Sequence, residues 1–140
     1  MHRNWGLLQT LREALRTEPN VKLAVLFGST ARGDAGRRSD IDLLIAWKDK
    51  SRARPGALLA KLEDATGRRV DFVPWEQAKK SPLLLAQVLG EGRVIIDRGY
   101  VWPRLLTQQD AIRARARRHE RRLAKEAGDA LAELGASSNE

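Results

Sequence analysis

The sequence predicts an α/β (α+β) protein, in which helices pack on a small mixed β-sheet and a further helix follows at the C-terminus. Short apolar segments rich in β-branched and aliphatic residues alternate with segments whose apolar residues recur at helical spacing. Of the 140 residues, 42% are hydrophobic and 31% are charged, which is typical of one globular domain with a modest core. We expect that domain over residues 1–98, a helical extension over 99–135 and a disordered tail over 136–140.

The first part of the chain contains a helix and two strands that a short glycine-rich connection joins. Apolar residues at helical spacing predict a helix over residues 5–17. The segments 21–27 and 41–47 are each short, apolar and bounded by turn-forming residues, so both are predicted to be strands. Within the connection, residues 30–32 are expected to form one helical turn, which Gly33 interrupts.

The middle of the chain alternates helices with strands. Predicted helices cover residues 56–66, 76–80 and 82–89, and predicted strands cover residues 69–75 and 93–97. The helix 56–66 carries its leucines on one side, and the strands are rich in valine and isoleucine. This order of elements is typical of an α/β arrangement with a mixed sheet.

The last predicted helix covers residues 106–134. Its apolar residues form a narrow stripe of mostly small side chains at spacings of three and four. Such a stripe fits either a helix laid across the domain or a helix that packs on a partner helix. Seven Arg and Lys residues lie within 113–125, and a solvated helix face is the favoured interpretation of this basic run. Its alternative is a surface for RNA or for an acidic protein.

A motif of small and acidic residues connects the first two strands. Gly28-Ser29 follows the first strand, and Asp40-x-Asp42 opens the second after ten further residues. Side chains two apart in a strand share a face, and two carboxylates so placed repel each other unless a cation lies between them. Carboxylate oxygens are ligands that suit Mg²⁺. Gly28 allows the backbone to approach a phosphate closely, and Ser29 supplies hydrogen-bond donors to it. The motif therefore predicts a metal and phosphate site; its alternative is a solvated turn with an exposed acidic pair.

A third acid, Asp71, lies within the predicted strand 69–75. A regular strand would place Asp71 on the same side as the apolar Val73, where an unpartnered carboxylate is costly. Asp71 is then either a solvated edge residue paired with Arg68 or Arg69, or a further carboxylate of the same acidic cluster.

Arginines in the connection are candidates for binding a triphosphate, because a guanidinium matches phosphate oxygens with two parallel hydrogen bonds. Arg32 is the preferred candidate, and Arg37 and Arg38 are weaker ones, since flexible surface arginines often bind nothing specific. We therefore assign Arg32, with Gly28 and Ser29, to nucleotide binding.

The spacing of Gly28-Ser29 and Asp40-x-Asp42 resembles the signature of the DNA polymerase beta-like nucleotidyltransferase superfamily. Within it, residues 5–97 are similar to the minimal nucleotidyltransferases (MNT), the antitoxins of MNT/HEPN toxin–antitoxin pairs. The resemblance implies the nucleotidyltransferase fold. It also implies two Mg²⁺ ions and an ATP substrate, with the catalytic, metal-binding acids being Asp40, Asp42 and Asp71.

The resemblance further implies a reaction and a partner. A minimal nucleotidyltransferase would transfer AMP from ATP to a hydroxyl, expected to be that of a tyrosine, on a cognate HEPN ribonuclease toxin and thereby silence it. One alternative is a non-catalytic antitoxin that acts by binding alone. Another is a nucleotidyltransferase that acts on tRNA or on a small hydroxylated molecule, which the basic helix would favour.

Composition limits the other classes of function. The formal net charge of +8 attracts polyanions in general without choosing among them. No cysteine is present, which excludes disulfides and thiolate metal sites and is compatible with the cytoplasm, where we expect the protein. The two histidines, His2 and His119, are too few for a histidine-rich zinc site. No apolar run approaches the length of a membrane span.

Overall fold

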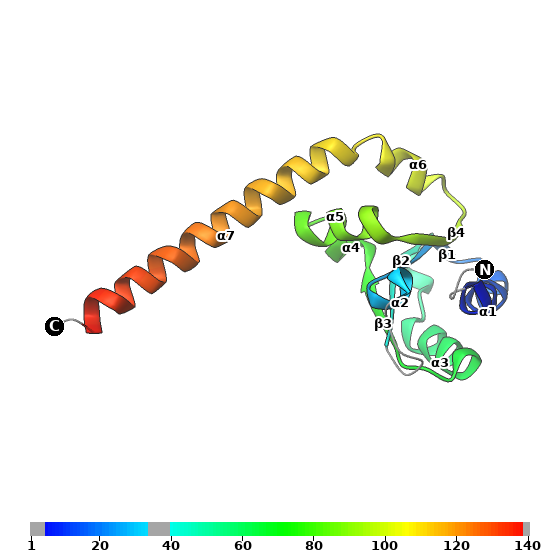
Figure 1. Cartoon of the computed structure of the whole chain (residues 1–140). Helices are drawn as coiled ribbons and strands as arrows, with labels where there is room; N and C mark the ends of the chain where they lie inside the picture. Colours follow the sequence, from blue (N-terminus) through cyan, green and yellow to red (C-terminus); the bar gives the residue numbers. More distant parts are fainter. Residues whose placement is uncertain (1–4, 34–39, 139–140) are drawn as a thin grey trace.

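The computed structural model describes residues 5–33 and 40–138, and within 136–138 it describes the backbone alone. Its centre is a four-stranded mixed sheet (Figure 1). The strands are β1 (Val21–Phe27), β2 (Ile41–Trp47), β3 (Val70–Pro74) and β4 (Arg93–Asp97). Their order in the sheet is β3-β2-β1-β4, with β1 antiparallel to both β2 and β4 and β2 parallel to β3. The predicted mixed sheet is therefore confirmed.

The helices that the sequence predicted before β4 are present, but two further helices, one before β4 and one after it, were not predicted. They are α1 (Trp5–Arg16), α2 (Ser29–Arg32), the short 3-10 helix η1 (Lys50–Arg52), α3 (Pro55–Thr66), α4 (Trp75–Ala78), α5 (Pro82–Glu91), α6 (Val101–Leu106) and α7 (Gln109–Ser138). The sequence predicted neither η1 nor α6. The last helix begins at Gln109 rather than at 106 and continues to Ser138, so residues 136–138, which were expected to be a disordered tail, are helical.

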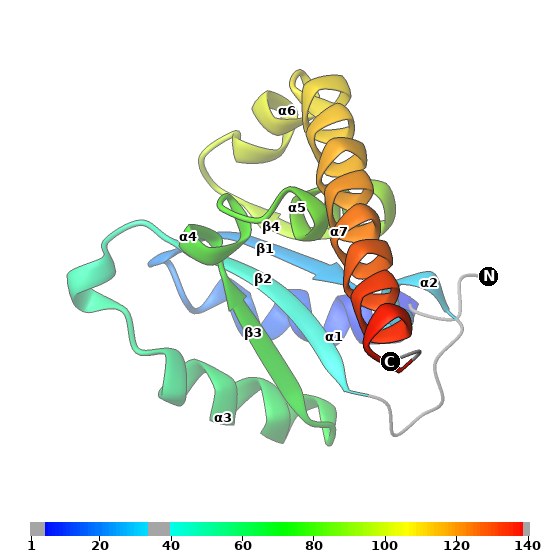
Figure 2. The same cartoon turned by 90° about the vertical axis from the view of Figure 1, so that its left-hand side faces the viewer.

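Helices cover both faces of the sheet (Figure 2). On one face, the leucines of α1 and α3 pack against β2; Leu11, Leu62 and Leu43 are each fully buried there. On the other face, Val88 of α5 packs with Leu44 of β2. Because side chains alternate along a strand, every second residue of β2 faces α4 and α5. This alternation decides on which side of the sheet the acidic residues lie.

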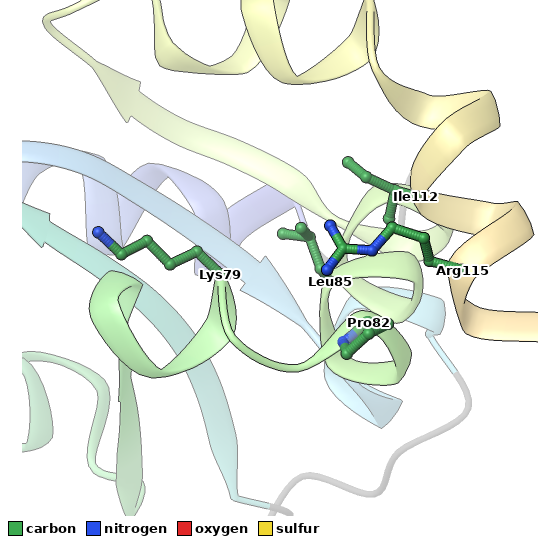
Figure 3. A pocket seen from close by; sticks show the side chains of 5 residues that line it. All are labelled: Lys79, Pro82, Leu85, Ile112 and Arg115. Atoms are coloured by element: carbon green, nitrogen blue, oxygen red, sulfur yellow. The ribbon is translucent and has the colours of Figure 1, made fainter. Parts of the chain in front are cut away.

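The helix α7 packs on the domain only at its beginning. Ile112 lies beside Leu85 of α5, where Figure 3 shows a pocket between the two helices that contains none of the predicted site residues. Beyond this contact, α7 runs away from the sheet (Figure 1), and Leu123, Leu131 and Leu134 are 45%, 69% and 68% exposed. The apolar stripe of α7 thus packs on the domain in the first turns of the helix and is exposed to solvent in the remaining turns.

Arg98, which directly follows β4, holds the end of α1 against the sheet. Its guanidinium donates to the backbone carbonyls of Glu18 and Val21 at 2.7 and 2.8 Å and to that of Leu15 at 3.1 Å. The last carbonyl groups of a helix accept no hydrogen bond from within the helix. A cationic donor placed beside them supplies these hydrogen bonds and so stabilises the end of the helix.

We expect Arg98→Ala to lower the free energy of unfolding by about 2–3 kcal/mol, because it removes several hydrogen bonds from one charged group. Urea unfolding of the purified protein measures the change. Arg104→Ala is the matched control: its guanidinium also donates to two backbone carbonyls, those of Gly99 and Tyr100, but at the surface. Equal losses in the two variants would contradict the role given to Arg98.

None of the helices within the described part of the chain is both long enough and apolar enough to cross a membrane.

Candidate functional site

The turn between β1 and α2 passes directly beside the first acid of β2. Gly28 has φ 79° and ψ −163°, a conformation that is essentially restricted to glycine. A Cβ atom built on Gly28 would collide with Oδ2 of Asp42. The backbone therefore reaches the carboxylate of Asp42 only because residue 28 has no side chain. The helix α2 begins here at Ser29, one residue before the helical turn that was expected over residues 30–32.

Two of the predicted acids face each other across neighbouring strands. Asp42 of β2 pairs in register with Asp71 of β3 in the parallel ladder, so the two side chains share a face. Leu44 and Val73, two residues further along each strand, belong to the apolar cluster under α4 and α5. Asp42 and Asp71 thus lie on the α5 side of the sheet, and the predicted orientation of Asp71 toward Val73 is confirmed.

Asp71 also makes the ion pair that was its alternative explanation. Oδ1 of Asp71 lies 3.7 Å from Nε of Arg69, and the side chains are 45% and 73% exposed. An ion pair that is so exposed and so long contributes little to stability. It therefore leaves Asp71 available for a stronger partner such as a metal ion.

Asp40 is held at the entry to β2 by a buried threonine. Thr30 of α2 is 2% exposed, and its hydroxyl donates to the backbone carbonyl of Asp40 at 3.0 Å. This bond joins the two ends of the connection, whose residues 34–39, Arg37 and Arg38 included, lie outside the described part of the chain. The Asp40 residue itself is exposed.

Burial, together with the neighbouring acidic residues, raises the pKa of Asp42 above its ordinary value of 3.8. Burial contributes most, followed by the negative charges of Asp71, Asp40 and Glu91, while Arg32 acts in the opposite direction. A carboxyl group whose pKa is raised in this way is destabilised when ionised. A cation bound among these acids would relieve that repulsion.

Sequence analysis missed one acid at this site, Glu91 at the end of α5. Its Oε1 accepts from the backbone N–H of Gly28 at 3.0 Å and from Nε2 of Gln87 at 2.7 Å, and its Oε2 lies 2.7 Å from a guanidinium nitrogen of Arg32. Arg32 thus pairs with a carboxylate that also binds Gly28, and its predicted role in binding the triphosphate stays a prediction. The only local signal was an acidic residue in the last turn of a helix, where the helix dipole disfavours it.

Asp42 and Asp71 are suited to binding magnesium, because their oxygens are the kind of ligand that Mg²⁺ prefers and because a cation would relieve the repulsion between them. Hard carboxylate oxygens are the ligands that Mg²⁺ prefers, and Asp42 and Asp71 present them from adjacent positions. No group of three His, Cys, Asp or Glu side chains within residues 5–33 and 40–138 is gathered closely enough to hold a metal ion. Asp40 acts on the pKa of Asp42 through its charge, and its predicted role as a third metal ligand stays a prediction.

The fold and the site together define a class. A mixed sheet in which a Gly-Ser turn lies against a carboxylate, with a second carboxylate in register on the parallel neighbour, is the arrangement of a nucleotidyltransferase domain. It places a backbone that allows close approach of phosphate beside oxygen ligands for a cation.

Comparison with known families identifies the class more closely. Residues 9–100 match the family model described as "Polymerase beta, Nucleotidyltransferase". The chain therefore belongs to the polymerase beta nucleotidyltransferase family, and the predicted fold is confirmed. No curated protein sequence matches the chain significantly.

Chains of several solved toxin–antitoxin complexes have a similar structure. One, from a complex with AMP-PNP, has a TM-score of 0.66 and 24% identity, and the match covers 86% of this chain and 97% of that one. Another, from a mutant MntA–HpeT complex, has a TM-score of 0.67 and 21% identity over 86% and 97%. A third comes from a complex of tri-AMPylated Shewanella oneidensis HEPN toxin with MNT antitoxin, with a TM-score of 0.50 and 21% identity over 91% and 98%. At these identities the likeness establishes the fold.

Proposed function

We propose that this protein is an Mg²⁺-dependent nucleotidyltransferase antitoxin of the cytoplasm that transfers AMP from ATP to a hydroxyl of a cognate HEPN ribonuclease toxin. The expected acceptor is a tyrosine hydroxyl, and the modification would neutralise the toxin. The observation that carries the proposal is the in-register pairing of Asp42 with Asp71 beside the backbone of Gly28. The family of the chain supports the type of reaction.

The solved neighbours support the nucleotide and the partner. One of them was crystallised with AMP-PNP, an ATP analogue, and another as an MNT antitoxin with an AMPylated HEPN toxin. Both resemble this chain over more than four-fifths of its length. We infer the same substrate and the same class of partner for this chain.

Each residue of the site has a role in this proposal. Asp40, Asp42 and Asp71 would hold magnesium, which supplies charge neutralisation for the phosphates and lowers the pKa of an acceptor hydroxyl. The N–H of Gly28, the hydroxyl of Ser29 and the guanidinium of Arg32 would bind the triphosphate. Fixed donors placed where pyrophosphate departs stabilise the charge that develops on it.

A protein acceptor fits the surface better than a small molecule. The exposed half of α7 presents Leu123, Leu131 and Leu134 to solvent, and Figure 1 shows this half extending away from the sheet. Apolar side chains in a row on an otherwise charged helix are typical of a surface that binds another protein.

The proposal predicts transfer of the α-phosphate and not of the γ-phosphate. The protein and a cognate HEPN toxin, incubated with Mg²⁺ and ATP labelled at the α-phosphate, should give a labelled HEPN band. ATP labelled at the γ-phosphate should give none, because the γ-phosphate leaves within pyrophosphate. Omission of Mg²⁺ should abolish labelling. Labelling from the γ-position would show a kinase, and an absence of any labelling would remove the proposed reaction.

The exposed α7 surface also favours a second candidate, an antitoxin that neutralises its partner by occlusion alone. Occlusion needs neither ion nor nucleotide. Ribonuclease activity of the HEPN protein, measured after ATP has been removed with apyrase before mixing, distinguishes the two. Full neutralisation under that condition supports occlusion, whereas neutralisation that requires ATP supports AMP transfer.

A further inference from the structure

Glu91 occupies the groups that the proposed function assigns to phosphate. Its carboxylate accepts from the N–H of Gly28 at 3.0 Å and pairs with Arg32 at 2.7 Å. A backbone N–H and a guanidinium that converge on one anion form a phosphate-type binding site, and here the anion belongs to the protein itself.

Unfavourable and favourable contributions to the free energy of the ionised Glu91 side chain meet at this position. It is the last residue of α5, where the negative end of the helix dipole repels a carboxylate, and its charge also repels Asp42. Burial, which leaves the side chain 16% exposed, acts to raise the pKa of Glu91, but hydrogen bonds from Arg32, Gln87 and Gly28 outweigh it and lower the pKa. Glu91 is therefore ionised at neutral pH and is held in place chiefly by the phosphate-binding groups.

We propose that Glu91 is an internal competitor for the phosphate site and so determines which nucleotides are admitted. A ligand must displace the carboxylate from Gly28 and Arg32 in order to bind. A magnesium-bound nucleoside triphosphate does so, because its phosphates carry more charge than one carboxylate and its cation offers the released Glu91 a favourable environment. A nucleoside monophosphate does not. The inference rests on the proposed function, since it concerns the same site.

Glu91→Gln tests the inference, because glutamine keeps an acceptor for the Gly28 N–H and removes the negative charge. The expected result is tighter binding of Mg²⁺·AMP-PNP by about tenfold in calorimetry, which corresponds to ~1.4 kcal/mol. AMP, which the unmodified protein binds weakly, should gain by a larger factor, so that discrimination between AMP-PNP and AMP falls. Glu133→Gln is the control: it removes the same charge from the exposed far half of α7 and should change neither affinity.

Gln87→Ala gives a second test if Glu91→Gln does not fold, as judged by circular dichroism. Gln87 donates to Glu91 without lying at the phosphate groups, so its removal loosens the carboxylate and should tighten AMP-PNP binding in the same direction by a smaller factor. Unchanged or weaker AMP-PNP binding in the Glu91 variant would overturn the inference and would make Glu91 a structural tether or a metal ligand. If the unmodified protein bound no AMP-PNP with Mg²⁺, the proposed function would fail as well.

Discussion

Asp42→Asn is expected to abolish AMP transfer and at the same time to stabilise the protein. Loss of one carboxylate ligand should lower the rate of transfer on the order of a thousandfold, since charge neutralisation at the phosphates is worth several kcal/mol. The substitution is nearly isosteric, and it removes a charge that Asp71, Asp40 and Glu91 all repel. At neutral pH we expect the Tm to rise by roughly 2–4 °C, which for a domain of this size corresponds to about 1 kcal/mol or less.

The stabilisation by Asp42→Asn should depend on pH with a definite sign. Because the pKa of Asp42 in the folded protein is raised above 3.8, the folded state holds a proton that the unfolded chain has already released. The stability of the unmodified protein therefore falls as the pH rises through the window that begins near 3.8 and ends at the raised value. The variant lacks this loss, so the difference in Tm should be largest at neutral pH and should vanish below pH 3.8.

The change in Tm on addition of Mg²⁺ and AMP-PNP tests the role of Asp42 in ligand binding. Addition of Mg²⁺ with AMP-PNP should raise the Tm of the unmodified protein, because a ligand that binds only the folded state stabilises it. The same addition should leave the Asp42→Asn variant unchanged. Asp64→Asn, which removes an exposed carboxylate on α3, should keep both transfer and the Tm response. A destabilised Asp42→Asn variant, or one that still labels its partner at the original rate, would contradict the assignment of Asp42.

The sheet could be predicted from the sequence because its strands carry local signals. The bounds of β1 and β2 are those that the apolar segments 21–27 and 41–47 predicted. The side on which Asp71 lies also followed from alternation along one strand. Its exact opposition to Asp42 did not, because the register of a parallel pair is set by the packing of the intervening α3 and not by a turn.

The helix α6 was not predicted because the glycine before it and the proline within it are each residue types that disfavour a helix. Gly99 and Pro103 are residue types that usually interrupt a helix, yet a proline in the first turn costs no hydrogen bond, since the N–H groups there have no partner within the helix. Those N–H groups are instead bound by Asp97, whose carboxylate accepts from Gly99, Val101 and Trp102 at 2.9–3.2 Å. The capping residue belongs to β4 and so lies outside the helix pattern.

The contact of Glu91 with Gly28 could not be predicted, because 63 residues separate them and no periodic pattern relates them. It exists because α5 packs on β1 and so brings its last residue to the end of that strand. Sequence patterns assign residues to faces of one element, and they do not state which elements meet. The sequence therefore indicated Gly28 and Arg32 as candidates for phosphate binding, but it did not indicate that the carboxylate of Glu91 binds to both.

Gly28→Ala is expected to destabilise the protein strongly, because backbone strain and a collision act together at this position. The backbone of Gly28 lies in a region that disfavours all other residues by about 1–3 kcal/mol, and the new Cβ would collide with Oδ2 of Asp42. We expect a loss of about 3 kcal/mol in the free energy of unfolding, seen as a Tm lower by roughly 10 °C. Binding of AMP-PNP should also be lost, because the displaced Asp42 leaves the site.

Two comparisons separate the backbone strain of Gly28→Ala from the collision. Gly33→Ala introduces a Cβ at the same φ of 79° but with no atom within 4 Å, so it should show backbone strain alone, about 1 kcal/mol. Combining Gly28→Ala with Asp42→Ala removes the carboxylate that the Cβ meets, so the cost of the glycine substitution should fall. The remaining cost is the backbone strain of Gly28 and should stay above that of Gly33→Ala, because Gly33 has a ψ of 9° in the left-handed helical region and Gly28 has a ψ of −163°. Urea unfolding of the four variants measures this coupling. Additive losses would mean that the turn does not approach Asp42, and the phosphate site built on that approach would have no structural basis.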